Sequence, residues 1–129
     1  MAEPLVVFDN VVKRFGTFEA VKRMNFEIRE GEFLAFMGPS GCGKTTTLRM
    51  IAGLERATSG DVIIAGQRMN ELSPQKRDIA MVFQFYALYP ALTVGQNIAM
   101  PLHSENLSKA DSDARVMKVA QIMHLTEVL

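Results

Sequence analysis

A run of small and polar residues interrupts an apolar segment between Phe33 and Met50. The sequence FLAFMGPSGCGKTTTLRM places five apolar residues before a glycine-rich stretch and then returns to helix-forming residues. A continuous apolar segment of this kind is typical of a strand buried on both faces of a parallel sheet. The following residues predict a helix over 44–52, and Gly53 stands where a glycine commonly ends a helix. We therefore expect a strand, a tight loop and a helix in direct succession.

The loop Gly38–Thr45 fits the phosphate-loop pattern G-x-x-x-x-G-K-[ST]. Glycines reach backbone angles closed to other residues, so several N–H groups can turn toward one anion. One charge at a helix N-terminus gains only about 0.3–1 kcal/mol, so many N–H groups and the Lys44 ammonium must act together. We expect Lys44 to bind the β- and γ-phosphates, Thr45 to ligate Mg²⁺ and Thr46 to donate to the α-phosphate. The residues expected to contact the nucleotide are Gly38, Ser40, Gly41, Cys42, Gly43, Lys44, Thr45 and Thr46, with Cys42 as a small spacer rather than a catalytic group.

Four further segments predict strands and two predict helices. The strands are expected at Leu5–Phe8, Met24–Ile28, Val62–Ile64 and Ile79–Phe83. Mixed strand and helix order predicts an α/β fold with some antiparallel pairing near the N-terminus. For the helices, Thr93 is expected to cap a short one that Pro101 ends, and Ser108 a longer one with Asp111 at the capping-box position and a core-packed stripe at Val116, Val119, Ala120 and Met123.

Charge and cysteine content exclude some classes of protein. Lys and Arg together number 14, as do Asp and Glu, which argues against a charge-driven nucleic-acid binder. A single cysteine cannot form an internal disulfide and fits a reducing compartment. The N-terminus has neither the basic region nor the apolar length of a signal peptide.

A stretch without charged residues extends from Ile79 to Leu102. Its length could span a bilayer, but its glutamines, prolines and glycine suit a spanning helix poorly. We therefore expect a buried strand followed by an apolar loop, or an exposed apolar patch that binds a partner.

The segment IAGLERATSGDVIIAGQRMNELSPQKRDIAMVFQFYALYPALTVGQNIAM resembles the nucleotide-binding subunit of ATP-binding-cassette (ABC) transporters, especially importer ATPases for sugars and related solutes. The resemblance extends over the chain from about Leu5. It implies that residues 1–129 form part of one P-loop ATP-binding domain, with an N-terminal antiparallel part, a central parallel sheet and the start of a helical subdomain. It further implies ATP and Mg²⁺ as cofactors, a second ATP-binding subunit as dimer partner, and a place on the cytoplasmic face of the cell membrane.

The resemblance also assigns roles to individual residues. Phe15 matches the aromatic residue that stacks on adenine, although the sequence equally allows a core phenylalanine. Gln84 matches the glutamine that touches Mg²⁺ and the attacking water, so Lys44 and Gln84 are the expected catalytic residues. The Phe85–Leu92 region matches the surface that receives a short helix of the transmembrane permease subunit. Tyr86, Leu88 and Tyr89 are its expected contact residues, while Phe85 departs from the smaller or more polar residue of the family.

Two hallmarks of the family do not occur in the sequence. No apolar segment after Gln84 ends in Asp-Glu, and no glycine-rich LSGGQ-type signature is present. We therefore expect an N-terminal portion of the domain, which binds ATP without turnover and lacks central strands of its sheet. The alternatives are a non-catalytic fragment that binds nucleotide or partner, and another P-loop kinase or GTPase. The guanine-binding Asn-Lys-x-Asp tetrapeptide does not occur, which disfavours a GTPase.

Overall fold

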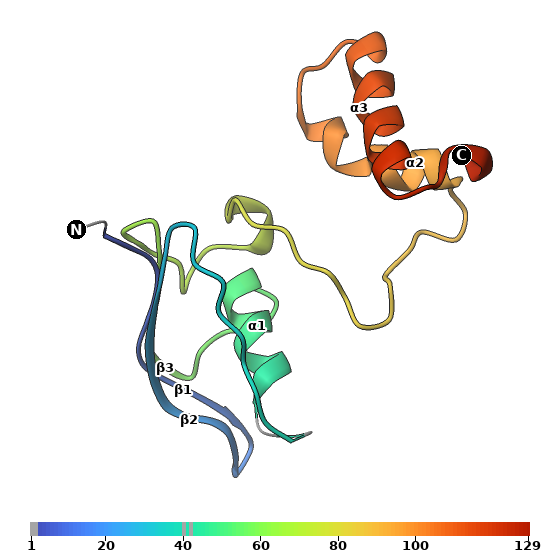
Figure 1. The fold of residues 1–129 in the computed structure, drawn as a ribbon. Helices are drawn as coiled ribbons and strands as arrows, with labels where there is room; N and C mark the ends of the chain where they lie inside the picture. The colour runs from blue at the N-terminus through green and yellow to red at the C-terminus, as the bar shows by residue number, and fades with distance from the viewer. Residues whose placement is uncertain (1–2, 40, 42) are drawn as a thin grey trace. The chain divides into compact units, whose positions relative to one another are not determined.

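The computed structural model describes residues 3–39, 41 and 43–129. The chain divides into two compact units, Met1–Met81 and Val82–Leu129. The first unit contains a sheet and one α-helix, and the second contains two α-helices with short 3₁₀ turns (Figure 1). Among the described residues, no helix is both long enough and apolar enough to cross a bilayer.

The sheet of the first unit is a four-stranded antiparallel sheet. Its strands are β1 (Pro4–Phe15), β2 (Phe18–Arg29), β3 (Ser59–Ile64) and β4 (Gln67–Arg68), in the order β2-β1-β3-β4. Phe8 of β1 lies opposite Phe26 of β2 and Val62 of β3. The three predicted strands in this part of the chain are confirmed, and two of them extend into a long hairpin. The expected antiparallel part of the fold is therefore present.

Helix α1 (Lys44–Ala52) covers one face of this sheet (Figure 1). Its bounds and its terminal Gly53, in the left-handed conformation, are as the sequence predicts. Met50 packs into the apolar cluster with Phe8 and Val62, and each such buried side chain contributes about 1.5–3 kcal/mol. This packing fixes the helix, and with it the phosphate loop, against the sheet.

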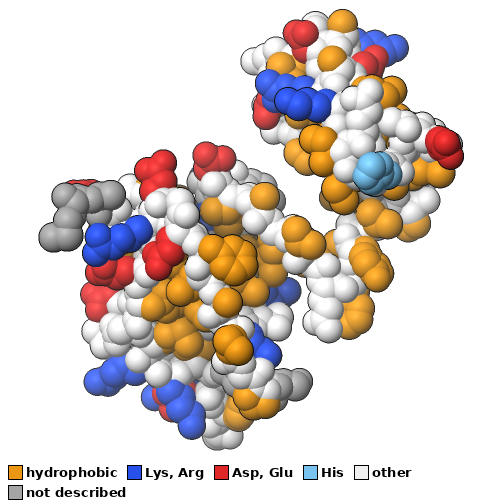
Figure 2. Space-filling model, in the orientation of Figure 1, with side chains coloured by type: hydrophobic (Ala, Val, Ile, Leu, Met, Phe, Trp, Pro, Cys, Tyr) orange, Lys and Arg blue, Asp and Glu red, His pale blue; other side chains and the backbone are white. Residues whose placement is uncertain are grey.

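Two predicted strands are absent, which corrects the sequence-based expectation. Residues 33–37 and 79–83 form no strand, and every ladder in the described part of the chain is antiparallel. Phe33 is 94% exposed and Val82 is 97% exposed. Within the 33–37 segment, Phe36 packs edge-on against the Phe26 ring. Figure 2 shows apolar side chains gathered on the visible face of the first unit. A strand needs a backbone partner as well as apolar side chains, and neither segment has one among the described residues.

The second unit is built from α2 (Val94–Ala99) and α3 (Lys109–Ile122). The described residues also form 3₁₀ turns, η1 (Pro74–Lys76) in the first unit and η2 (Met100–Ser104) and η3 (Thr126–Val128) in the second. Both predicted caps are confirmed, because the Thr93 hydroxyl accepts from the Gln96 N–H and the Ser108 hydroxyl from the Asp111 N–H. The expected burial of the α3 stripe is confirmed at Ala120 and only partial at Val116, and it is wrong at Val119 and Met123, which are 42% and 61% exposed. The short α2 cannot cover a helix of fourteen residues.

Candidate functional site

The phosphate loop is held against β2 where α1 begins. Gly43 has a φ of 95°, and a Cβ there would lie 2.6 Å from the Ala20 carbonyl oxygen. The N–H and the hydroxyl of Thr47 both donate to the Gly43 carbonyl, at 2.9 and 2.8 Å. Only glycine satisfies both the backbone angle and the close approach, which explains the residue before Lys44 in the motif.

The Lys44 side chain turns back over the loop. Lys44 is half-buried, and its ammonium donates to the Gly38 carbonyl oxygen, so the cation stands at the start of the loop and at the N-terminus of α1. No acidic side chain lies in the first turn of α1, and its N-cap is a glycine without a capping side chain. The first N–H groups and the ammonium therefore suit an anionic ligand. Ser40 and Cys42, two of the expected contacts, lie outside the described residues.

The expected metal ligands have different surroundings. Thr45 is exposed on the first turn of α1, while Thr46 is half-buried. Gln84 is exposed in a turn of the second unit. The described residues contain no cluster of three acidic, histidine or cysteine side chains that could hold an ion. Mg²⁺ commonly keeps several waters and binds through one or two protein groups plus phosphate oxygens, so the Thr45 hydroxyl fits a metal that arrives with a nucleotide.

Phe15 lies at the end of the β1–β2 hairpin, opposite Phe18. Its ring is 46% exposed, which excludes the core position that the sequence left open. The Lys13 ammonium stands over the ring, 5.1 Å from its centroid. A cavity of about 430 Å³ lies between β2 residues, including Phe18 and Lys22, and Gly41 of the loop. Phe18, which lies opposite Phe15 in the hairpin, thus lines a cavity together with a residue of the phosphate loop.

No role is predicted for Arg77 from the sequence, yet the structure buries it to 5% exposure. Its guanidinium donates to the carbonyl oxygens of Met50 and Ile51, at the C-terminal end of α1, at 2.8 and 3.1 Å. It also donates to the Met69 and Leu72 carbonyls, at 2.6 and 3.1 Å. Burial lowers the pKa of Arg77 from its usual value, yet an arginine remains cationic in proteins. A cation here complements the negative end of the phosphate-loop helix, and no local pattern in the sequence predicts it.

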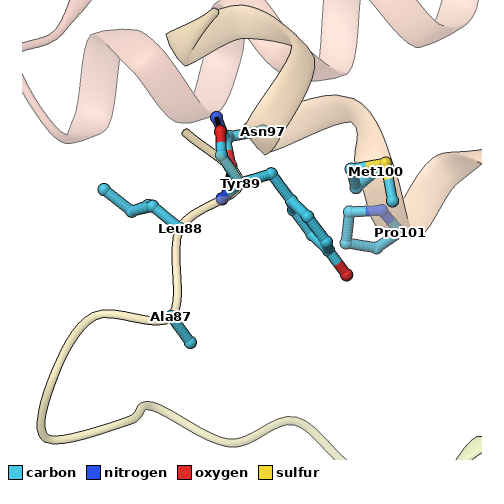
Figure 3. Close-up of a pocket in the computed structure, with 6 residues that line it drawn as sticks. All are labelled: Ala87, Leu88, Tyr89, Asn97, Met100 and Pro101. Atoms are coloured by element: carbon cyan, nitrogen blue, oxygen red, sulfur yellow. Dashed lines mark hydrogen bonds between the residues drawn. The ribbon is translucent and has the colours of Figure 1, made fainter. Parts of the chain in front are cut away.

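The Phe85–Leu92 segment is exposed, and Asn97 of α2 fixes its shape. Tyr86 and Ala87 both have positive φ, at 67° and 54°, which non-glycine residues adopt rarely. The Asn97 side chain accepts from the Tyr89 N–H at 2.9 Å and donates to the Tyr89 carbonyl at 3.2 Å. In Figure 3 the Tyr89 ring points toward Met100 and Pro101, along a cavity of about 390 Å³.

Comparison with known proteins identifies the family of this chain. The family model described as "ABC transporter" matches residues 21–128. The chain belongs to the ABC transporter family. The resemblance drawn from the phosphate loop and the following segment is thereby confirmed.

Several ABC importer subunits are similar to the whole chain but much longer. The trehalose import ATP-binding protein SugC of Mycobacterium tuberculosis is 55% identical over 130 residues, which is 100% of this chain and 33% of SugC. The sn-glycerol-3-phosphate import protein UgpC of Rhodopseudomonas palustris is 50% identical, and the maltose/maltodextrin import protein MalK of Yersinia pestis 49%. Each alignment covers 96% of this chain and 34% of the relative. The chain therefore spans about a third of the length of these relatives.

Solved ABC cassettes share the fold. A dimeric bacterial ABC transporter cassette superimposes with a TM-score of 0.84 at 31% identity, covering 92% of this chain and 57% of that chain. A dimeric post-hydrolysis cassette bound to ADP and phosphate gives 0.82 at 32% identity, with the same coverage. The fold is therefore that of a partial ABC-type P-loop domain.

Proposed function

We propose that this chain binds ATP with Mg²⁺ as part of an ABC ATPase subunit that couples ATP hydrolysis to solute import, with carbohydrates as the solute class. The geometry at the start of α1 supports this proposal most directly. Gly43 is pressed against β2, the Lys44 ammonium is held at the loop, and α1 has no acid in its first turn. A nucleotide phosphate would replace the Gly38 carbonyl as the acceptor of the Lys44 ammonium. It would also accept hydrogen bonds from the first N–H groups of the helix.

The remaining contacts of the nucleotide are proposed for residues of the loop and for two side chains outside it. The exposed ring of Phe15 offers a stacking surface for adenine, worth about 0.5–1.5 kcal/mol beyond its burial. The loop residues between Gly38 and Thr46 hold the triphosphate. Thr45 would ligate Mg²⁺ together with phosphate oxygens and water. Gln84 would contact the metal and the attacking water, because its neutral amide accepts hydrogen bonds without adding charge.

Binding without turnover is the activity that we propose for these 129 residues alone. The sequence has no Asp-Glu strand end after Gln84 and no glycine-rich signature loop. We infer that a second ATP-binding subunit closes the site, because the similar cassettes of known structure are dimeric. A phosphate-release assay distinguishes binding from turnover.

Calorimetry with MgATP tests the phosphate site. We expect heat of binding for the unchanged protein and no measurable binding after Lys44→Ala, because the loop loses its only cation. Lys76→Ala, at an exposed lysine of η1, is the matched control and should bind as before. Equal binding by the Lys44→Ala protein, or equal affinity for MgGTP in the unchanged protein, would contradict the proposal.

We further propose that the Phe85–Leu92 segment is the contact for a transmembrane permease subunit, with the whole assembly on the cytoplasmic face of the membrane. Leu88 is 69% exposed beside the cavity at Tyr89. Apolar groups held in a fixed loop are typical of interface anchors. In co-expression with candidate permease subunits, Leu88→Asp should abolish co-purification. Ile122→Asp in α3, at a residue 66% exposed, should leave it intact. Loss in both variants, or in neither, would argue against this segment as the contact.

A further inference from the structure

The Lys13 side chain is fixed at three points around the Phe15 ring. Its Nζ donates to the Arg56 carbonyl oxygen at 2.7 Å and lies 3.2 Å from the Glu55 carboxylate. The same atom stands 5.1 Å from the centroid of the Phe15 ring, and only 15% of the side chain is exposed. The ammonium is therefore anchored by the connection between α1 and β3 rather than free to move with the solvent.

Strand geometry places the lysine and the ring together. Lys13 and Phe15 lie two residues apart on β1, and the contact between the ammonium and the ring shows that their side chains lie on the same side of the strand. A cation over the face of an aromatic ring is attracted by the negative charge of that face. Because Glu55 and Arg56 hold the cation, the ring lies against a fixed group on one side, while about half of its surface stays open to solvent.

We propose that Lys13 is a positioning residue for nucleotide binding: it holds the Phe15 ring so that the opposite face receives the base. The proposal rests on the proposed function, in which Phe15 stacks on adenine. The ring has fewer orientations to lose when the base arrives, which lowers the entropic cost of stacking. The cation also draws on the π-electrons of the ring, which reduces the repulsion between its open face and the face of a purine.

A merely structural role for Lys13 would have a different signature. If the lysine only joined β1 to the Glu55–Arg56 connection, its loss would disturb the whole unit, including the phosphate loop. A positioning role affects only ligands that carry a base. Magnesium tripolyphosphate has the phosphates of ATP without the base, so the pair of ligands separates the two roles.

The first test compares the two ligands by calorimetry. Lys13→Met should weaken MgATP binding about three- to fivefold, a loss of affinity that corresponds to the free energy of one cation–π contact. The same variant should leave the binding of magnesium tripolyphosphate unchanged. Lys13→Arg keeps the cation and should recover most of the affinity for ATP. The matched control Lys76→Met should change neither ligand. Equal losses for both ligands, or no loss of ATP affinity, would overturn the proposal.

A second measurement needs no nucleotide. The sequence contains no tryptophan, so Phe15→Trp introduces a single fluorescent ring at this position. Adding Lys13→Met to that variant should increase the fast local motion of the indole in fluorescence anisotropy decay. Identical decays with and without Lys13 would overturn the contact on which the proposal depends.

These measurements also separate this proposal from the proposed function. If neither MgATP nor magnesium tripolyphosphate binds the unchanged protein, the proposed function fails, and the anisotropy decay still decides whether Lys13 holds the ring. If Phe15→Ala leaves ATP affinity unchanged, the stacking assignment fails instead. If Phe15→Ala weakens ATP binding and Lys13→Met does not, only the positioning role of Lys13 is lost.

Discussion

The strands of the antiparallel sheet and the apolar segments 33–37 and 79–83 differ in burial although they are similar in composition. Val62 of β3 is 2% exposed, whereas Val82, in an equally apolar segment, is 97% exposed. Val62 lies on a strand that pairs with β1 and faces α1, while residues 79–83 have no ladder among the described residues. An apolar pattern therefore predicts burial only where the backbone also finds a hydrogen-bonding partner.

Arg77 precedes the 79–83 segment, and its replacement should produce the largest effect on stability. Its guanidinium donates to the Met50 and Ile51 carbonyl oxygens at the C-terminal end of α1. Arg77→Met keeps much of the side-chain length but removes the donor to the Met50, Ile51 and Leu72 carbonyl oxygens, while the Met69 carbonyl keeps the Leu72 N–H. We expect the free energy of unfolding in urea to fall by about 3–5 kcal/mol.

The control for this prediction is a surface arginine. Arg56 pairs with Glu71, but 67% of its side chain is exposed. Exposed ion pairs contribute about 0–1 kcal/mol, so Arg56→Met should leave the unfolding midpoint nearly unchanged. Similar losses in the two variants would show that the buried carbonyl contacts of Arg77 do not stabilise the first unit.

Gly60 tests how closely β1 and β3 must approach, with a smaller expected effect. Its φ is +81°, and a Cβ there would overlap the Asn10 carbonyl and lie 2.7 Å from the Asp9 carbonyl oxygen. Gly60→Ala should therefore destabilise the first unit by about 2–3 kcal/mol, measured by urea unfolding. Gly66 has nearly the same φ, +78°, with open space around it, so Gly66→Ala should cost only about 1 kcal/mol. Equal costs would mean that the backbone angle alone, and not strand packing, requires glycine at position 60.

The features that the sequence predicted correctly depend on neighbours within a few residues. The bounds of α1 follow from the phosphate-loop motif before it and Gly53 after it. The caps at Thr93 and Ser108 each require a hydroxyl and an N–H three residues later. Because such signals are local, they need no knowledge of the rest of the fold.

The features that the sequence did not predict depend on residues far apart in the chain. Lys13 meets Glu55 and Arg56 more than forty residues later, and only their meeting turns a strand lysine into a fixed cation beside Phe15. The exposure of Phe15, which excluded the core alternative, likewise depends on what packs around the hairpin. The sequence signal for the contact between Lys13 and Phe15, a lysine two residues before an aromatic residue, is too common to be specific.

The sequence by itself determined the phosphate loop, the helix that follows it and the family, because these are encoded in short contiguous patterns whose chemistry is local. Tertiary structure alone decided which apolar segments pair into a sheet, where the Arg77 charge is buried and which cation stands over Phe15. The physical reason is that burial and pairing require two surfaces, and a linear pattern describes only one of them.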